Sequence, residues 1–172
     1  MLIDDTEKYN LIWDKVYDKL NFKPSCSYRG HSMCSDLPFE INVEHSVYGI
    51  EKMSDDQISR MDAVIREQLI AVSKKERQWY ALDWQHSAFL FDPRNTEDQK
   101  SFWKEDSRYF GGGYYAYFPS FYPDGDYYFF IDEDFKYGYL GHPWRQEVWI
   151  FGDELIKRFD IIYKELGWEK LR

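Results

Sequence analysis

The fold is decided by residues 114–131, which read YYAYFPSFYPDGDYYFFI. Two runs of aromatic β-formers, Tyr114–Phe118 and Asp126–Ile131, lie on either side of Pro123-Asp124-Gly125-Asp126. Pro, Asp and Gly in close succession are typical of a tight turn. The segment therefore predicts a hairpin and an antiparallel sheet built around it.

Other strands are predicted on both sides of this segment. Tyr80–Phe91 is predicted as one long strand, because its side chains alternate between two faces: Leu82, Trp84, His86, Ala88 and Leu90 on one, and Asp83, Gln85 and Ser87 on the other. Glu147–Phe151 is predicted as a short strand, and the segments around Tyr28 and over Glu40–Tyr48 as further strands. Residues 92–113 are predicted as a surface loop.

Three segments carry apolar side chains at helical spacing between capping residues, namely 5–20, 55–75 and 153–166. Ser54 and Gln57 predict a capping box for the second helix, and Gly167 suits the end of the third. We expect the helices at the two ends of the chain to pack on one face of the sheet. The fold class is predicted as α+β, a single domain over 1–172 with a mainly antiparallel sheet packed by N-terminal, central and C-terminal helices.

The net charge of the chain limits the classes of partner that we expect it to bind. The formal net charge is -9, from 22 Lys and Arg against 31 Asp and Glu. Nucleic-acid backbones and anionic membranes are recognised by clustered Lys and Arg, so neither is expected as a partner. A basic protein partner fits this charge, and plain solubility is the alternative explanation.

The predicted setting is cytoplasmic. No apolar run approaches the roughly 20 residues of a membrane-spanning helix. The segment Met1–Asp5 lacks the basic and apolar regions of a secretory signal. Two cysteines, Cys26 and Cys34, do not make a disulfide framework.

Two histidines are candidate catalytic residues. On one long strand Asp83 and His86 point to opposite faces, so they are not expected to form an acid/base pair. His86 falls on the face of Leu82 and Trp84, which favours a buried structural histidine over a general base. His142 lies in the string Gly141-His142-Pro143-Trp144, which is typical of a turn. This turn could simply fix the strand Glu147–Phe151 to the sheet or could carry a functional site, and the sequence favours neither interpretation.

Two groups of residues suggest metal ligands only weakly. The acidic set Asp124, Asp126, Asp132, Glu133 and Asp134 has no calcium-loop spacing and is better explained by solvated turns. The second group is Cys26, His31 and Cys34, whose two sulfurs and one nitrogen could bind zinc with His45 as a fourth ligand. The spacing of these residues fits no common zinc-binding pattern. No metal and no cofactor are therefore predicted.

Four strings in this order resemble a bacterial family known as domain of unknown function 2716. They are Tyr80-Ala81-Leu82-Asp83-Trp84-Gln85-His86, Tyr122-Pro123-Asp124-Gly125-Asp126-Tyr127-Tyr128, Gly141-His142-Pro143-Trp144 and Ile150-Phe151-Gly152-Asp153-Glu154-Leu155. The resemblance covers most of the chain and implies a bacterial cytosolic protein, without implying an activity or catalytic residues. The order of strands and the helix opened by Phe-Gly-Asp-Glu-Leu are also loosely similar to small immunity proteins of bacterial toxin systems.

The leading functional hypothesis is a non-enzymatic acidic protein-binding domain, in particular an immunity or antitoxin-like inhibitor of a basic bacterial toxin. The residues expected to contact the partner are Asp124, Asp126, Tyr127, Asp132, Glu133, Asp134 and Trp144. The alternative is a small hydrolase or metal-dependent enzyme that uses His86 and His142 with Asp83, and it requires these side chains to share one pocket. A regulatory scaffold without catalytic activity is a third hypothesis, which the sequence does not separate from the first.

Overall fold

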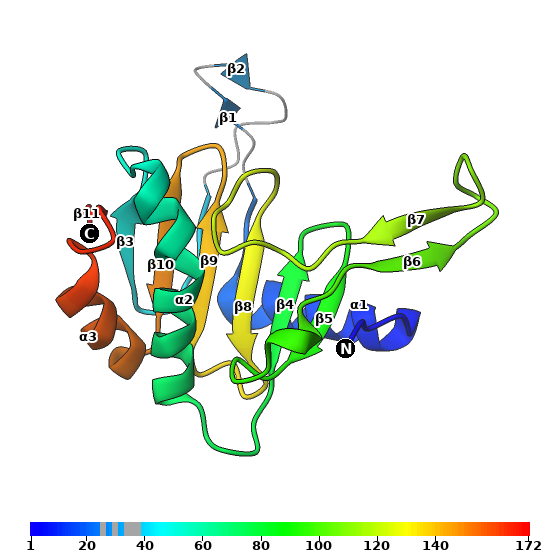
Figure 1. Ribbon diagram of the computed structural model, residues 1–172, viewed down its shortest axis with the longest axis horizontal. Helices are drawn as coiled ribbons and strands as arrows, with labels where there is room; N and C mark the ends of the chain where they lie inside the picture. Colours follow the sequence, from blue (N-terminus) through cyan, green and yellow to red (C-terminus); the bar gives the residue numbers. More distant parts are fainter. Residues whose placement is uncertain (25–26, 29–30, 33–38) are drawn as a thin grey trace.

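A seven-stranded sheet forms the centre of the computed structural model, which describes residues 1–24, 27–28, 31–32 and 39–172 (Figure 1). The strand order is β11-β3-β10-β9-β8-β4-β5, and each of these pairings is antiparallel. The strands are β3 (His45–Gly49), β4 (Trp79–Asp83), β5 (Ala88–Phe91), β8 (Tyr128–Asp132), β9 (Gly138–His142), β10 (Glu147–Phe151) and β11 (Glu169–Lys170). The predicted α+β class with a mainly antiparallel sheet is confirmed.

Two small hairpins accompany this sheet. β6 (Phe102–Glu105) pairs with β7 (Gly113–Ala116), and β1 (Ser27–Tyr28) pairs with β2 (His31–Ser32). A short 3-10 helix, η1 (Thr96–Asp98), precedes β6.

The three α-helices in the described residues begin where the sequence predicts, within one residue. They are α1 (Thr6–Leu20), α2 (Asp55–Val72) and α3 (Asp153–Ile162). The capping box of Ser54 and Gln57 is present at α2. α2 and α3 end earlier than predicted, and Ser73 already has extended backbone after α2.

The helices cover both faces of the sheet rather than one. Buried side chains of α2 and α3, such as Met61 and Phe159, pack in one hydrophobic layer, whereas Trp13 of α1 packs in the other. Figure 1 shows α2 in front of the sheet and α1 behind it. The prediction that the terminal helices share a face is therefore wrong. The physical reason lies in strands such as β8, where Phe129 and Phe130 point to opposite faces and are both buried. A sheet that is apolar on both faces must be shielded from water by other elements on both faces.

The predicted strand Tyr80–Phe91 is two strands joined by a turn at residues 84–87. Leu82 of β4 lies opposite Ala88 of β5, and Gln85 in the turn has a φ of 66°. The alternation of apolar and polar residues continues through the turn, so periodicity alone did not reveal it.

The predicted hairpin between Tyr114–Phe118 and Asp126–Ile131 is also wrong. β7 pairs with β6, which lies in the segment predicted as a loop, and β8 lies between β4 and β9. Gly111 and Gly112 have positive φ and lie at the end of the connection, residues 106–112, between β6 and β7. β9 is a strand that the sequence analysis missed.

Candidate functional site

The most exposed aromatic part of the described chain is the hairpin of β6 and β7, residues 102–117, which we call the aromatic arm. Figure 1 shows the arm extending away from the seven-stranded sheet beyond the edge strand β5. Twelve large hydrophobic side chains are exposed in the described residues, and seven of them belong to the arm: Phe102, Trp103, Tyr109, Phe110, Tyr114, Tyr115 and Tyr117. Scattered apolar side chains are normal on a surface, but a cluster of this kind indicates a contact site.

The arm presents three rings on one face. Trp103 lies directly opposite Tyr115 in the hairpin, and their ring centroids are 5.0 Å apart in an edge-to-face arrangement. The Tyr115 and Tyr117 centroids are 5.9 Å apart. Because side chains alternate along a strand, these rings form one continuous aromatic surface.

Polar contacts connect the arm to neighbouring segments of the chain. The hydroxyl of the buried Ser87 donates a hydrogen bond of 2.7 Å to the carbonyl oxygen of Tyr117. The Lys104 ammonium lies 2.7 Å from a carboxylate oxygen of Asp4. The arm is therefore attached at its base through the β4–β5 turn, which contains Ser87.

A cavity of about 390 Å³ lies between the arm and the β4–β5 turn. Its lining includes Asp83, His86, Tyr109, Tyr114, Tyr115 and Tyr117. The cavity thus combines tyrosine rings with a carboxylate and an imidazole.

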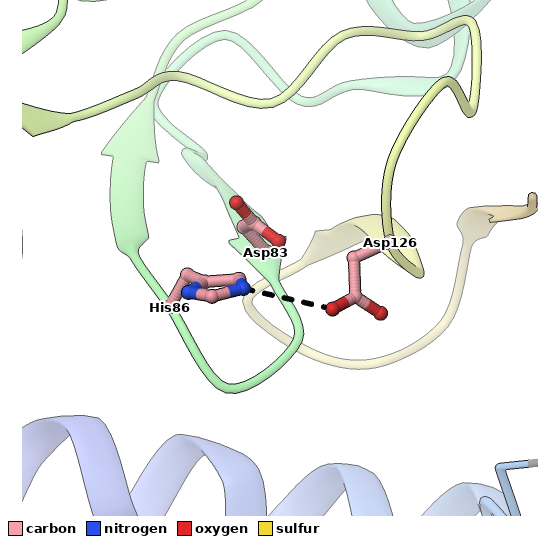
Figure 2. A group of neighbouring side chains, drawn as sticks. All are labelled: Asp83, His86 and Asp126. Atoms are coloured by element: carbon pink, nitrogen blue, oxygen red, sulfur yellow. Dashed lines mark ion pairs between the residues drawn. The ribbon is translucent and has the colours of Figure 1, made fainter. Parts of the chain in front are cut away.

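Asp83, His86 and Asp126, the acid–histidine cluster, come together as Figure 2 shows. Asp83 and His86 line the cavity. Asp83 ends β4, His86 lies in the turn after it, and Asp126 precedes β8. The ladder between β4 and β8 places Asp83 opposite Tyr128, which brings the nearby Asp126 alongside. One ligand atom from each residue lies within 4.8 Å of the other two, and His86 Nε2 is 3.7 Å from Asp126 Oδ2.

The surroundings of Asp83 disfavour its charged form. Burial raises the pKa of the Asp83 carboxyl to about 7, and the neighbouring charges of Asp126 and Asp124 add to the effect. Burial also raises the pKa of Asp126, against the opposing effects of the Tyr127 amide and His86. Two partly buried carboxylates thus lie close together with an imidazole beside them.

The predicted contact residues do not form one surface. Asp124 and Asp126 precede β8, whereas Asp132 ends this strand and Glu133 and Asp134 follow it. The two groups therefore lie at opposite ends of a five-residue strand.

The second group has local structural partners. Asp132 Oδ1 accepts hydrogen bonds of 2.6 Å from the amides of Lys136 and Tyr137, which closes the turn between β8 and β9. Glu133 accepts a bond from the Gln78 amide, and Asp134 pairs with Arg77 at 3.3 Å.

Tyr127 does not offer the surface that this prediction needs, because its side chain is fully buried. Its ring packs against Trp144, Trp84 and Phe39 in the layer covered by α1. Trp144 is partly buried against the same layer. Both rings therefore serve mainly in packing.

The two candidate histidines lie in different environments. The predicted buried setting of His86 is wrong, because the turn exposes 65% of its side chain. His142 ends β9 and is 1% exposed, and it does not line the cavity that His86 lines. The structure thus brings Asp83 and His86 together at this cavity, whereas His142 is buried and is not part of its lining.

The weak zinc prediction falls largely outside the described residues. Cys26 and Cys34, and the side chain of His31, are not among them. The fourth candidate, His45, stacks on Trp149 with ring centroids 4.7 Å apart, and its Nε2 lies 2.7 Å from the Arg172 guanidinium.

Comparison with known proteins identifies the family. Residues 3–156 match the family described as protein of unknown function (DUF2716). The chain belongs to this family. The resemblance stated from the sequence is thereby confirmed, and the match spans the aromatic arm and the acid–histidine cluster.

A curated relative of this DUF2716 chain is a bacterial protein of similar length. It is named "Uncharacterized protein YxiI", from Bacillus subtilis (strain 168), and is 28% identical over 156 residues, which cover 89% of this chain and 88% of the relative. No solved structure matches the chain. Within its described residues, no helix has both the length and the apolar character required to cross a membrane.

The sequence analysis of this DUF2716 member missed the arm, although a signal was present. Gly111-Gly112-Gly113 lies between Phe102-Trp103-Lys104-Glu105 and an aromatic run, and glycines between two such runs are typical of a hairpin. The first run lies instead within the surface loop that the sequence analysis predicted over residues 92–113.

Proposed function

We propose that this DUF2716 protein is a non-enzymatic protein-binding domain whose contact surface for a basic partner is the aromatic arm. The observation that carries the proposal is the concentration of exposed aromatic rings on this one projecting hairpin. Tyr and Trp rings provide large contact areas at a small cost in conformational entropy, and they are enriched among the residues that dominate binding energies.

The charge near the arm fits a cationic contact. Asp83 lines the cavity at the base of the arm, and Asp124 and Asp126 lie close enough to influence its pKa. A Lys or Arg side chain entering this cavity would meet the Asp83 carboxylate and the tyrosine rings that line it. Each cation–π contact would contribute about 0.5–2 kcal/mol.

The net charge of -9 would attract a basic partner over longer distances than these contacts. Opposite charges steer two proteins together, and the resulting association rate falls as salt screens the attraction. The partner we propose is a basic bacterial toxin domain, which the arm would bind and occlude as an immunity protein does. The net charge and the arm support this proposal together.

The test is a toxin-rescue experiment. Each basic protein encoded beside the chain's gene is co-expressed with the chain, and the expected result is that one is toxic alone and harmless with it. The double variant Trp103→Ala, Tyr115→Ala should weaken binding of that partner at least tenfold, because truncating central aromatic anchors costs about 2 kcal/mol or more. Affinity is measured by calorimetry at low and high salt.

The matched control is Ile161→Ser, which changes an exposed apolar side chain of α3 outside the arm. It should leave rescue and affinity unchanged. The proposal is contradicted if no adjacent basic protein binds, if the double variant binds as well as the wild type, or if affinity is indifferent to salt.

A further inference from the structure

We propose that Asp83, His86 and Asp126 form a binding site for a divalent transition-metal ion such as Mn²⁺ or Zn²⁺. This site goes beyond the proposed protein-binding function. It uses the Asp83 carboxylate that the proposed function offers to a basic side chain, so an ion and that side chain would compete for it. One potential ligand atom from each residue lies within 4.8 Å of the other two, so the group surrounds a common point (Figure 2).

The backbone fixes the two carboxylates independently of any ion. β4 and β8 are central neighbours in the sheet, and the Trp84 amide continues their pairing through a bond of 3.0 Å to the Tyr127 carbonyl. Asp83 and Asp126, which flank these two residues, are therefore held side by side. Metal sites need such preorganised ligands on rigid elements.

The second observation is an unsatisfied oxygen. Asp83 Oδ1 is buried and has no hydrogen-bond partner among the residues that the structure describes. A buried carboxylate oxygen without a partner is costly, and such groups in folded proteins call for an explanation such as a bound ion.

The charges around this oxygen also favour a bound cation. In the described part of the chain, Asp83 takes part in no ion pair, and the partner of Asp126 is His86. No Lys or Arg therefore neutralises the two carboxylates at this point. A divalent cation would remove their mutual repulsion, and it would leave the protein with a negative net charge.

The ligand set selects a class of metal. Carboxylate oxygens suit Mg²⁺, Ca²⁺ and Mn²⁺, whereas imidazole nitrogen suits Zn²⁺ and other transition metals. Two carboxylates with one imidazole therefore favour Mn²⁺ or Zn²⁺ over Ca²⁺ and Mg²⁺. Three protein ligands leave coordination positions open, and Asp83 and His86 line the cavity that could hold water in those positions.

Closing the site requires the three side chains to move inward, because their ligand atoms lie up to 4.8 Å apart. Ligands about 2.0–2.2 Å from an ion lie roughly 3 Å from one another when adjacent. The His86 Nε2 to Asp126 Oδ2 distance is 3.7 Å, and the exposed His86 side chain has room to move inward. The ion would then connect the β4–β5 turn, which holds the arm through Ser87, to the segment before β8.

The experiment uses the full chain without a tag, dialysed against EDTA and then against chelator-free buffer. MnCl₂, ZnCl₂, CaCl₂ and MgCl₂ are titrated separately by calorimetry. We expect one saturable Mn²⁺ or Zn²⁺ per chain, with Ca²⁺ and Mg²⁺ at least tenfold weaker. The variants Asp83→Asn, Asp126→Asn and His86→Ala should each weaken binding at least tenfold.

The control is Asp134→Asn, which removes the same charge at the other end of β8 and should leave binding unchanged. Metal-free melting temperatures check the fold, and Asp83→Asn should melt no lower than the wild type because it relieves carboxylate repulsion. The inference is overturned if no stoichiometric binding occurs, if the three variants bind like the wild type, or if Asp134→Asn weakens binding equally. Equally tight Ca²⁺ binding that His86→Ala does not affect would also overturn it.

Discussion

At the scale of single residues, burial decides what a titratable side chain can do. The His142 ring lies 4.5 Å from the Phe39 ring and 4.8 Å from the Tyr127 ring, measured between centroids. Burial, aided by the charge of Arg145, lowers the pKa of His142 to about 3. Its Nδ1 accepts a bond from the Arg145 amide, which suits a neutral ring. His142 is therefore a structural residue that stays neutral in the folded protein.

This environment predicts that His142 makes the fold sensitive to acid. Because the folded-state pKa lies below the unfolded value of about 6.5, the unfolded chain binds a proton first as the pH falls. The contribution of His142 is fully present above about pH 6.5 and is lost as the pH falls toward 3. At pH 4 the loss should be about 3 kcal/mol, by order of magnitude.

The measurement is urea unfolding of the wild type and of His142→Gln at pH 7 and pH 4. The variant should be less stable at pH 7 because its packing changes, but it should lose about 3 kcal/mol less between the two pH values. Equal losses in the two proteins would show that His142 does not titrate as this environment implies.

At the scale of elements, the sequence predicted which segments are regular better than it predicted their pairing. The residues at which the helices begin could be predicted, because capping residues and the spacing of apolar residues are local features of the sequence. Strand pairing depends on distant residues: β7 could have paired with β8, but Pro119 and Pro123 interrupt the segment between them, and β7 pairs with β6 instead.

The candidate site shows the same limit. Asp83 and Asp126 were both named from the sequence, yet their proximity depends on the ladder between β4 and β8, which has no local signature. The exposure of His86 depends on a turn that leaves the apolar and polar alternation unbroken. The sequence therefore identified the residues of the site but did not predict that they lie close together.

Ser87 should control the mobility of the aromatic arm. Its hydroxyl is buried and donates to the Tyr117 carbonyl, so Ser87→Ala leaves that carbonyl without this partner. We expect the free energy of unfolding to fall by about 1 kcal/mol. Hydrogen exchange of the arm amides should rise more than exchange in the seven-stranded sheet. Ser59→Ala, on the exposed surface of α2, is the matched control, and an arm no more mobile in Ser87→Ala than in this control would contradict the prediction.

At the scale of the whole molecule, one sheet separates two hydrophobic layers and belongs to both. β8 contributes Phe130 to the layer under α2 and α3, and Phe129 to the layer under α1. Neither layer can lose its packing without disturbing the strand that it shares with the other. The arm is joined to this arrangement at its base, where Ala116 is buried in the layer under α2 and α3, but seven of its aromatic side chains are exposed.

The shared sheet predicts that both layers unfold in one transition. Trp13→Ala removes an α1 ring that contacts Phe129 edge-to-face at 5.8 Å, and Met61→Ala empties a buried position of α2 on the other face. Each variant should lose about 2–5 kcal/mol, and the double variant should lose about their sum because the sites lie on opposite faces. Leu11→Ala, at an exposed position of α1, should change stability by no more than about 0.5 kcal/mol. Tryptophan fluorescence and far-ultraviolet circular dichroism should give coincident urea midpoints for every protein. Two separate transitions, with Trp13→Ala shifting only one of them, would show instead that the layers are independent and that the sheet does not couple them.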